Sequence, residues 1–213
     1  MWKKLFCTLF AVSLLFISAN AVFEYEIVDM KDLVGPSEWA KPEIELAQEA
    51  GLLTAHTSIN FRLDTTRFQF AELIVNMTEK VTGKAIAPAP ASTFTDCAEE
   101  VVLKAYAAGI VNGMGDNTFA PETTTNREQI ASMIARAVKY IETETGTNYA
   151  PAAPNIDKFT DKGEVSSWAV EGVGLLAANN IMGGTSATTL SPKNPCTLEQ
   201  SILLLYRFYA KTV

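Results

Sequence analysis

The chain has 213 residues, a formal net charge of −7 at pH 7, and 48% hydrophobic residues. This acidic balance argues against nucleic acid as a partner, because binding to nucleic acid draws much of its free energy from basic side chains on phosphates. The length suits one compact domain or a short array of small units.

The first 21 residues have the pattern of an export signal. Lys3 and Lys4 precede an apolar run over residues 5–17, and residues 18–21 supply the small side chains that signal peptidase reads. A membrane-spanning helix needs about 20 apolar residues, so we expect cleavage after Ala21 that leaves no transmembrane anchor. Cleavage removes two lysines and no acidic residue, which takes the formal net charge from −7 to −9.

Three segments of the remaining chain share one order of motifs, which predicts three tandem repeats over residues 22–83, 94–143 and 156–213. Each segment has an aspartate near its start, a helical stretch, a turn and a second helical stretch. The second stretch begins 17 residues after Ile110 in one segment and 17 residues after Ile181 in the next. Equal spacing of this kind is typical of internal repeats.

The second helical stretch of each segment begins with a capping signature. A favourable N-cap residue is followed by glutamine three positions later, and in this arrangement each side chain accepts a hydrogen bond from the other residue's backbone amide. The N-cap residues are Thr66, Asn126 and Thr197. Apolar residues then recur at helical spacing, so we expect the three second helices to bury their apolar stripes against one another.

The predicted fold class is all-α, with helix pairs from the three segments arranged around a central three-helix bundle. The first helices are predicted over residues 38–50, 99–108 and 167–179. Pro- and Ala-rich stretches over residues 83–90 and 143–155 are predicted to be extended connectors between the segments.

As a set, these motifs resemble the S-layer homology repeats of bacterial surface proteins, whose pattern runs Phe-x-Asp, Trp-Ala, Gly-Ile-x-x-Gly, Phe-x-Pro and Thr-Arg-Ala-Glu. The last motif appears here as Thr-Arg-Phe-Gln at residues 66–69 and as Asn-Arg-Glu-Gln at residues 126–129. The resemblance covers essentially all of the chain after Ala21 and implies an all-α spindle with pseudo-threefold symmetry. It also implies a secreted protein of the cell wall or cell surface. Grooves between its neighbouring repeats would bind a secondary cell wall polysaccharide, often one with acidic pyruvylated sugars.

In this family the arginine of the last motif contacts the anion, and tryptophan, aspartate and glycine positions shape the groove. Carried over by motif, the candidate polysaccharide-binding residues are Arg67, Arg127, Trp39, Trp168, Asp96, Asp161 and Gly113. A guanidinium binds a carboxylate through two parallel hydrogen bonds. Free amides at a helix start add to the attraction of an anion, and an indole face suits the apolar side of a sugar ring.

Four positions depart from the family pattern. Leu198 stands where the family has arginine, and Cys97 stands where the other two segments have tryptophan. Ala55 replaces the second glycine of the turn, and Asn126 replaces threonine but still caps its helix. We therefore expect the groove of the third segment to be inactive and at most two grooves to be competent.

The candidate residues also have structural alternatives. The arginines could be solvated or could form ion pairs within the protein. For the tryptophans a core position is the favoured alternative, because tryptophan is often largely buried. For Asp32, Asp96 and Asp161 the favoured alternative is a role in a cap or turn.

No catalytic site is predicted. His56 is the only histidine, so an ordinary zinc site cannot be assembled, and no metal or cofactor is expected. Cys97 and Cys196 are expected to be buried free thiols. Two functions remain open: attachment to the cell wall through polysaccharide, and binding of another surface protein after loss of polysaccharide affinity. The two motif arginines favour the first function, and Leu198 and Cys97 favour the second.

Overall fold

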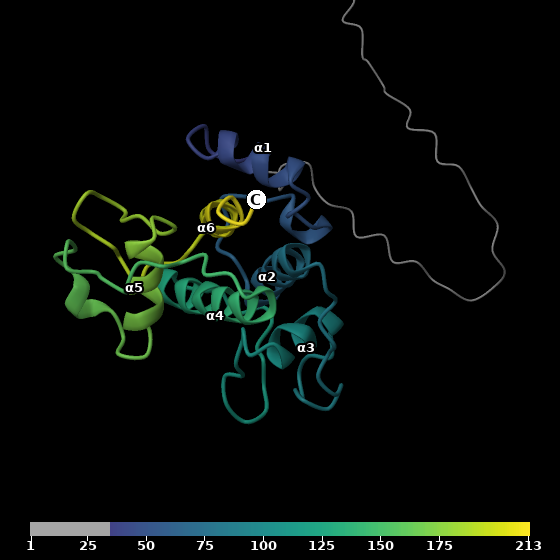
Figure 1. Cartoon of the computed structure of the whole chain (residues 1–213). Helices are drawn as coiled ribbons and strands as arrows, with labels where there is room; N and C mark the ends of the chain where they lie inside the picture. The colour runs from purple at the N-terminus through teal and green to yellow at the C-terminus, as the bar shows by residue number, and fades with distance from the viewer. Residues whose placement is uncertain (1–34) are drawn as a thin grey trace, which may run out of the picture.

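The structure, a computed structural model, describes residues 35–213 (Figure 1). The predicted signal peptide and Asp32 lie outside these residues. Six α-helices, two short 3-10 turns and no β-strand are found in residues 35–213, which confirms the all-α class. Every helix in this range falls short of the length or apolar character that spanning a bilayer requires.

Each of the three segments contributes a short first helix and a longer second helix. The first helices are α1 (Lys41–Glu49), α3 (Glu100–Ala107) and α5 (Val170–Ala178). The second helices are α2 (Arg67–Thr82), α4 (Arg127–Thr145) and α6 (Leu198–Tyr209). The 3-10 turns η2 (Ala55–Thr57) and η3 (Lys162–Glu164) lie in loops. Helix α4 runs two residues past the predicted segment end at 143, because the chain turns into the left-handed conformation only at Gly146.

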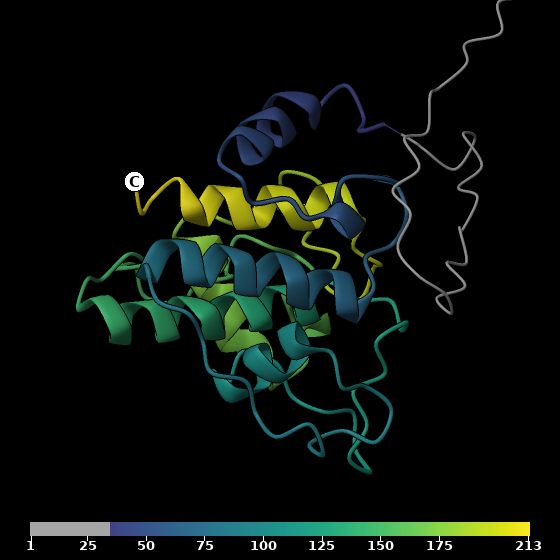
Figure 2. The same ribbon diagram turned by 90° about the vertical axis from the view of Figure 1, so that its right-hand side faces the viewer.

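The predicted capping boxes are present at the start of all three second helices. At α2, the Gln69 amide donates to Thr66 Oγ1 and the Thr66 amide donates to Gln69 Oε1, both at 3.1 Å. The apolar stripes that follow are buried, with Phe70, Ile134 and Phe208 among the largest fully buried side chains. Helix α2 packs against both α4 and α6, and Figure 2 shows the three helices running alongside one another.

The loops that lead into the second helices meet in a closed ring of backbone hydrogen bonds. The Thr65 amide donates to the Cys196 carbonyl at 2.9 Å, and the Cys196 amide donates to the Thr125 carbonyl at 3.0 Å. The Thr125 amide donates back to the Thr65 carbonyl at 2.9 Å. Each segment is therefore bonded directly to both of the others.

The first amides of each second helix are also bonded to a neighbouring segment. The N1 amide of α2 donates to the Thr123 carbonyl at 2.9 Å, that of α4 to the Asn194 carbonyl at 3.1 Å, and that of α6 to the Leu63 carbonyl at 2.8 Å. The capping box satisfies a further amide in each helix. The expectation that free amides at these helix starts help to attract an anion is therefore wrong, because protein carbonyls already occupy them.

Each first helix packs chiefly on the second helix of another segment. Helix α3 lies on α2, α5 lies on α4, and α1 lies on α6 (Figure 1). Because α1 contacts α6, the first segment also packs on the third, and the three segments form a closed ring of contacts. A groove beside a second helix can therefore receive side chains from all three segments.

Helices α1 and α5 begin three residues later than predicted. The reason lies in two buried glutamates of the second helices. Glu199 accepts hydrogen bonds from the Ser37 amide at 2.8 Å and the Ser37 hydroxyl at 2.9 Å. Glu128 accepts the same pair of bonds from Ser166, both at 2.9 Å. These bonds hold a turn ahead of each helix, and the tryptophan two residues after each serine lies in that turn.

Cys97 and Cys196 are free and buried, as expected. Burial raises the pKa of both thiols, which lowers the thiolate fraction that reacts with disulfide reagents. We expect the native chain from residue 22 onward, which lacks Cys7, to react with the thiol reagent dithionitrobenzoate much more slowly than the chain unfolded in guanidinium chloride. Labelling of the native chain at the unfolded rate would contradict this burial.

Candidate functional site: two arginine–tryptophan grooves

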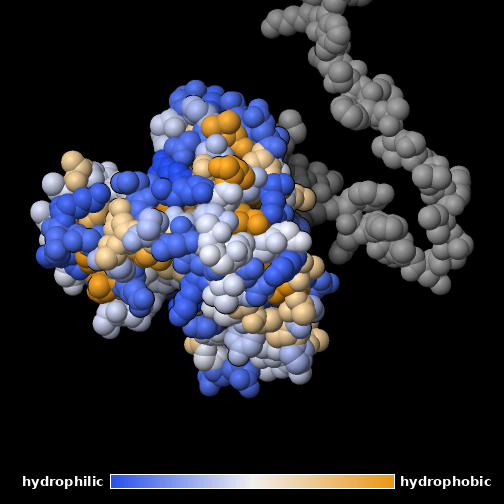
Figure 3. Space-filling model, in the orientation of Figure 1, coloured by the Kyte–Doolittle hydropathy of each residue, from blue (hydrophilic) through white to orange (hydrophobic). Residues whose placement is uncertain are grey.

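Two hollows contain the candidate arginines, on a surface where lobes are separated by indentations (Figure 3). Groove A has a volume of about 280 Å³ and is lined by Arg67, Asn112, Gly113, Met114, Gln129, Ser132, Met133, Arg136 and Trp168. Groove B has a volume of about 320 Å³ and is lined by Trp39, Arg127, Gly183, Gly184, Thr185, Gln200, Leu203, Leu204 and Arg207.

Each groove draws on all three segments. Groove A combines Arg67 from the first segment, the turn at residues 112–114 with helix α4 from the second, and Trp168 from the third. Groove B has the equivalent residues one segment further along: Arg127, residues 183–185 and Trp39. The structure thus brings each candidate arginine together with a candidate tryptophan far from it in sequence.

Arg67 is a buried bridge between two segments. Arg67 is only 6% exposed. Its Nε donates to the Phe119 carbonyl at 2.8 Å and its Nη2 donates to the Asn112 carbonyl at 2.7 Å. Its guanidinium carbon lies 4.6 Å from the centroid of the Phe119 ring, within the range of a cation–π contact. The alternative of a solvated side chain is therefore wrong for Arg67.

Arg127 has the same environment in groove B. It is also 6% exposed, and it donates to the Leu190 carbonyl at 2.9 Å and the Gly183 carbonyl at 2.8 Å. Burial lowers the pKa of both guanidiniums, against the opposing charge of a nearby aspartate in each case. In each arginine Nε and Nη2 are engaged, and Nη1 makes no hydrogen bond to residues 35–213.

The two tryptophans lie at the groove surface. Trp39 is 58% exposed and Trp168 is 55% exposed, so the favoured alternative of a core position is wrong for both. The cause is the turn described above, in which a buried glutamate fixes the serine two residues earlier. An exposed indole beside a guanidinium offers an apolar face and a cation to the same ligand.

Asp96 has a role in a turn, the alternative favoured from its position. Its Oδ1 accepts from the Phe119 amide and its Oδ2 accepts from the Ala120 amide, both at 2.7 Å. Ala120 has a φ of 57°, a left-handed conformation that is uncommon outside glycine. The carboxylate thereby fixes the peptide whose carbonyl receives Arg67. Asp161 holds the equivalent turn through the amides of Leu190 and Ser191.

The acid dependence of stability follows from these two aspartates. The Phe119 amide is the largest cause that lowers the pKa of Asp96. Burial opposes the shift at Asp161, but the Leu190 and Ser191 amides and the Arg127 charge outweigh it, so its pKa is lowered as well. A folded pKa below the unfolded value of about 3.9 gives stabilisation that is complete above the unfolded pKa and is lost as the pH falls through the folded pKa.

We therefore expect the urea midpoint to fall between about pH 5 and pH 3, and to fall less steeply in an Asp96→Asn, Asp161→Asn double variant. Equal acid dependence of the two proteins, measured by circular dichroism, would contradict the assignment.

Gly113 is required because its turn is closely packed. A Cβ on this residue would lie 2.9 Å from the Thr118 carbonyl oxygen and 3.1 Å from Phe94 Cε1. Gly184 is the equivalent residue in groove B, where a Cβ would lie 2.4 Å from two carbonyl oxygens. The prediction from sequence included Gly113 and missed Gly184.

Two further arginines line the grooves and were also missed. Arg136 lies in groove A and Arg207 lies in groove B, each nine residues after the first residue of its helix. Arg136 donates from Nη1 to the Ile110 carbonyl at 3.1 Å, whereas Arg207 forms a two-bonded ion pair with Glu43 at 2.8 Å. The same spacing of nine residues from the helix start, in two of the segments, was the signal that could have identified both.

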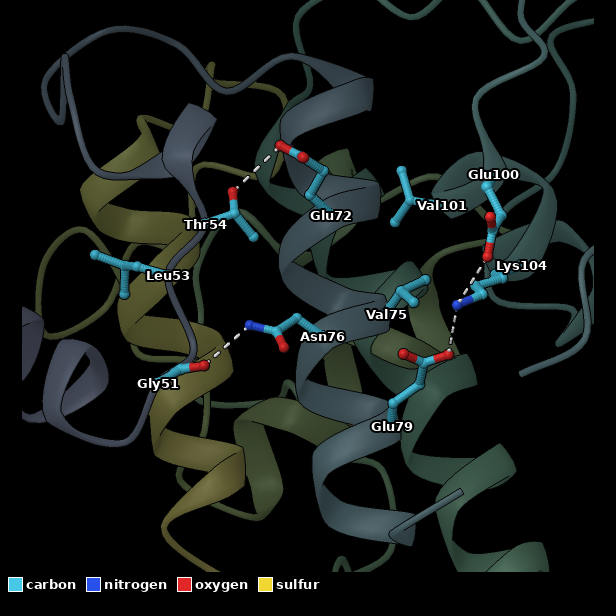
Figure 4. A pocket seen from close by; sticks show the side chains of 10 residues that line it. All are labelled: Gly51, Leu53, Thr54, Glu72, Val75, Asn76, Glu79, Glu100, Val101 and Lys104. Carbon is cyan, nitrogen blue, oxygen red and sulfur yellow. Dashed lines mark hydrogen bonds and ion pairs between the residues drawn. The ribbon is translucent and has the colours of Figure 1, made fainter. Parts of the chain in front are cut away.

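A third hollow, groove C, lies beside α2 and has a volume of about 510 Å³. Its lining residues are Gly51, Leu53, Thr54, Glu72, Val75, Asn76, Glu79, Glu100, Val101 and Lys104 (Figure 4). Glu72 accepts from the Thr54 hydroxyl at 3.3 Å and pairs with His56 at 3.0 Å, while Lys104 lies between Glu79 and Glu100. The lining of groove C thus contains three glutamates and one lysine, and it contains no arginine.

Leu198 and Cys97 occupy the third pair of arginine and tryptophan positions. By the order seen in grooves A and B, a third site takes its first residue from α6 and its tryptophan position from the second segment. Those positions are Leu198 and Cys97, both buried and neither in the lining of groove C. The third site therefore lacks the arginine and the tryptophan, and the other two sites have both. Among residues 35–213, no group of three or more histidine, cysteine or acidic side chains is placed to hold a metal.

Known proteins share parts of this chain. The chain is 25% identical over 203 residues to an amylopullulanase of Thermoanaerobacterium thermosulfurigenes, which covers 92% of this chain and 10% of that protein. It is 24% identical over 189 residues to exoglucanase XynX of Acetivibrio thermocellus, and this match covers 86% of this chain and 16% of that protein. It is 29% identical over 115 residues to cell surface glycoprotein 1 of the same organism, and this match covers 48% of this chain and 5% of that protein. The chain thus spans less than a fifth of the length of each of these relatives.

A family model also matches the chain, over residues 95–131 and 158–200. These ranges include Arg127 and both glycine-containing turns of grooves A and B. They also include Trp168. Two segments of this chain therefore match the S-layer homology domain.

Proposed function

We propose that this chain is a secreted module of three S-layer homology repeats that attaches to the bacterial cell wall without a covalent bond. The repeats span residues 22–83, 94–143 and 156–213, arranged as a spindle around α2, α4 and α6. The ligand is an acidic secondary cell wall polysaccharide, for example one with pyruvylated sugars. The observation that carries the proposal is the pair of equivalent grooves in which a buried guanidinium lies beside an exposed indole.

The chemistry of the two grooves suits an acidic sugar. The free Nη1 of Arg67 or Arg127 donates to a carboxylate, a charge-assisted bond stronger than a neutral one. The neighbouring indole covers the apolar face of the sugar ring. A polymer that reaches both grooves gains affinity from the second contact without any new kind of interaction. Because the chain is acidic overall, attraction of a polyanion comes from these local cations and not from the net charge.

The relatives support a module that is carried by different proteins. Their names describe two enzymes and a cell surface glycoprotein, and each matches this chain over a small share of its own length. A segment shared by proteins of such different names fits attachment to the cell surface. The proposal includes no catalytic step.

Sedimentation with cell walls tests the proposal. The purified protein is mixed with native sacculi and with sacculi stripped of their secondary polymer, and the pelleted fraction is measured. We expect pelleting with the native sacculi only. A Trp39→Ala, Trp168→Ala double variant is expected to lose most binding, because both side chains are exposed at the grooves. Leu63→Ala is the matched control, since Leu63 is 59% exposed and lines neither groove. Equal pelleting with both kinds of sacculi, or with neither, would contradict polysaccharide binding.

A second function is favoured by groove C and by the third site. The three glutamates of groove C, and the loss of the arginine and the tryptophan at the third site, suit contact with another protein of the cell surface better than contact with an acidic glycan. In the same experiment, retained pelleting with stripped sacculi together with insensitivity to the tryptophan variant would favour this function.

A further inference from the structure

The two complete grooves differ in the state of their second arginine. In groove B, Arg207 Nε and Nη2 donate to the two carboxylate oxygens of Glu43, both at 2.8 Å. This two-bonded pair satisfies the side of the guanidinium that is best shaped for a carboxylate. It also neutralises the charge of Arg207, so Arg127 is the only arginine lining groove B that forms no ion pair among the described residues.

In groove A the equivalent Arg136 makes no ion pair among the described residues. Within residues 35–213 its one hydrogen bond is from Nη1 to the Ile110 carbonyl at 3.1 Å, and Nε and Nη2 make none there. Burial is the largest cause that lowers the pKa of Arg67, and the charge of Arg136 lowers it further. The two cations therefore lie close together in one hollow of about 280 Å³ whose lining contains no carboxylate.

The groove also continues beyond Arg136. A neighbouring hollow of about 380 Å³ shares Ser132, Arg136 and Trp168 with groove A. Its other charged lining residues are Lys139, Glu142 and Glu171, so its charge is balanced. A glycan can thus pass from the cationic hollow across Trp168 into a hollow that does not favour a second negative charge.

We infer that groove A is the primary site and that it holds the carboxylate of one acidic sugar between Arg67 and Arg136. Groove B holds the same sugar through Arg127 alone and is the weaker site. The inference rests on the proposed function for its polymer ligand, and it adds a specificity-determining residue, Arg136, together with an order of affinity. Because a second guanidinium adds a charge-assisted bond, we expect about a tenfold difference in affinity, which corresponds to about 1.4 kcal/mol.

Each groove contains its own tryptophan, which allows the two sites to be measured separately. The purified protein is labelled with 5-fluorotryptophan, and the fluorine resonances of Trp39 and Trp168 are assigned with single Trp→Phe variants. Sodium galacturonate is the acidic probe and galactose is the neutral one. We expect the Trp168 resonance to titrate at about tenfold lower galacturonate concentration than the Trp39 resonance, and galactose to shift both only weakly.

Two substitutions separate the charges. Arg136→Gln is expected to bring the Trp168 titration to within about twofold of the Trp39 titration, because one guanidinium is lost. Glu43→Gln is expected to strengthen binding at Trp39 several-fold, because it releases Arg207. Thermal unfolding of both variants checks that the fold is retained. Glu43→Gln raises affinity, so its predicted effect cannot be produced by partial unfolding.

Equal affinities at the two tryptophans would overturn the inference. So would an unchanged tenfold difference in Arg136→Gln, or the absence of any shift with galacturonate. Sedimentation with sacculi is read independently. Pelleting with native sacculi together with equal affinities at the two grooves would support the proposed function and contradict this inference. Unequal affinities without pelleting would support this inference and contradict the proposed function.

Discussion

Replacement of Arg67 by alanine is expected to lower the free energy of unfolding by about 2 to 4 kcal/mol. The substitution removes hydrogen bonds to the carbonyls of Phe119 and Asn112 and leaves those oxygens unsatisfied in a partly buried site. It also removes the guanidinium from the Phe119 ring. Urea unfolding followed by circular dichroism measures the loss.

Arg67→Lys is the matched control. Lysine keeps the charge but presents a single ammonium group, which cannot reproduce the fork that joins two carbonyls. We expect it to recover less than half of the lost free energy. An Arg67→Ala protein within about 0.5 kcal/mol of the wild type would show that the bridge is not structural. Because of this bridge, loss of wall binding in an arginine-to-alanine variant does not by itself identify a ligand contact, and the exposed tryptophans are the better probes.

Glu128→Ala is expected to cost about 2 to 4 kcal/mol, because it leaves the Ser166 donors without an acceptor, while the half-exposed Lys193 is rehydrated. Glu128 is 2% exposed, and its carboxylate holds the Ser166 amide and hydroxyl and pairs with Lys193. Removal leaves these donors without their acceptor. It also releases the turn that places Trp168, so wall binding is expected to weaken further than stability alone explains.

Glu199→Ala is the comparison for this prediction. Glu199 holds Ser37 in the same way but has no lysine partner among the described residues, so we expect a smaller cost of about 2 kcal/mol. Urea unfolding gives both costs, and acrylamide quenching of tryptophan fluorescence reports whether the indoles have moved. Equal and small costs for the two variants would contradict the anchoring role of these carboxylates.

The local features of the fold were predictable from the sequence because they depend on neighbouring residues. The capping boxes at Thr66, Asn126 and Thr197 need only a cap and a glutamine three residues later, and all three are present. The apolar stripes of the second helices follow from helical spacing in the same way. The starts of α1 and α5 were placed three residues early, because the turn ahead of each depends on a glutamate from a distant segment.

The candidate site was predictable in its residue types but not in its combinations. The motif comparison named Arg67 and Trp168 without indicating that they share a groove, because that follows from the order in which the helices of different segments pack. Burial of the tryptophans was the favoured alternative because propensity describes an average residue and not one held in a turn by a remote carboxylate. Leu198 and Cys97 looked like defects of two segments, although the order in which the helices pack assigns both positions to one site.

The number of polymer fragments bound per chain tests the account most directly. Short fragments of secondary polymer are released from sacculi, purified and titrated into the protein, and the occupied states are counted by native mass spectrometry. We predict two fragments per chain, one in groove A and one in groove B, with groove A filled first. Three fragments would contradict the claim that Leu198 and Cys97 disable the third site, and no bound fragment would contradict attachment through these grooves.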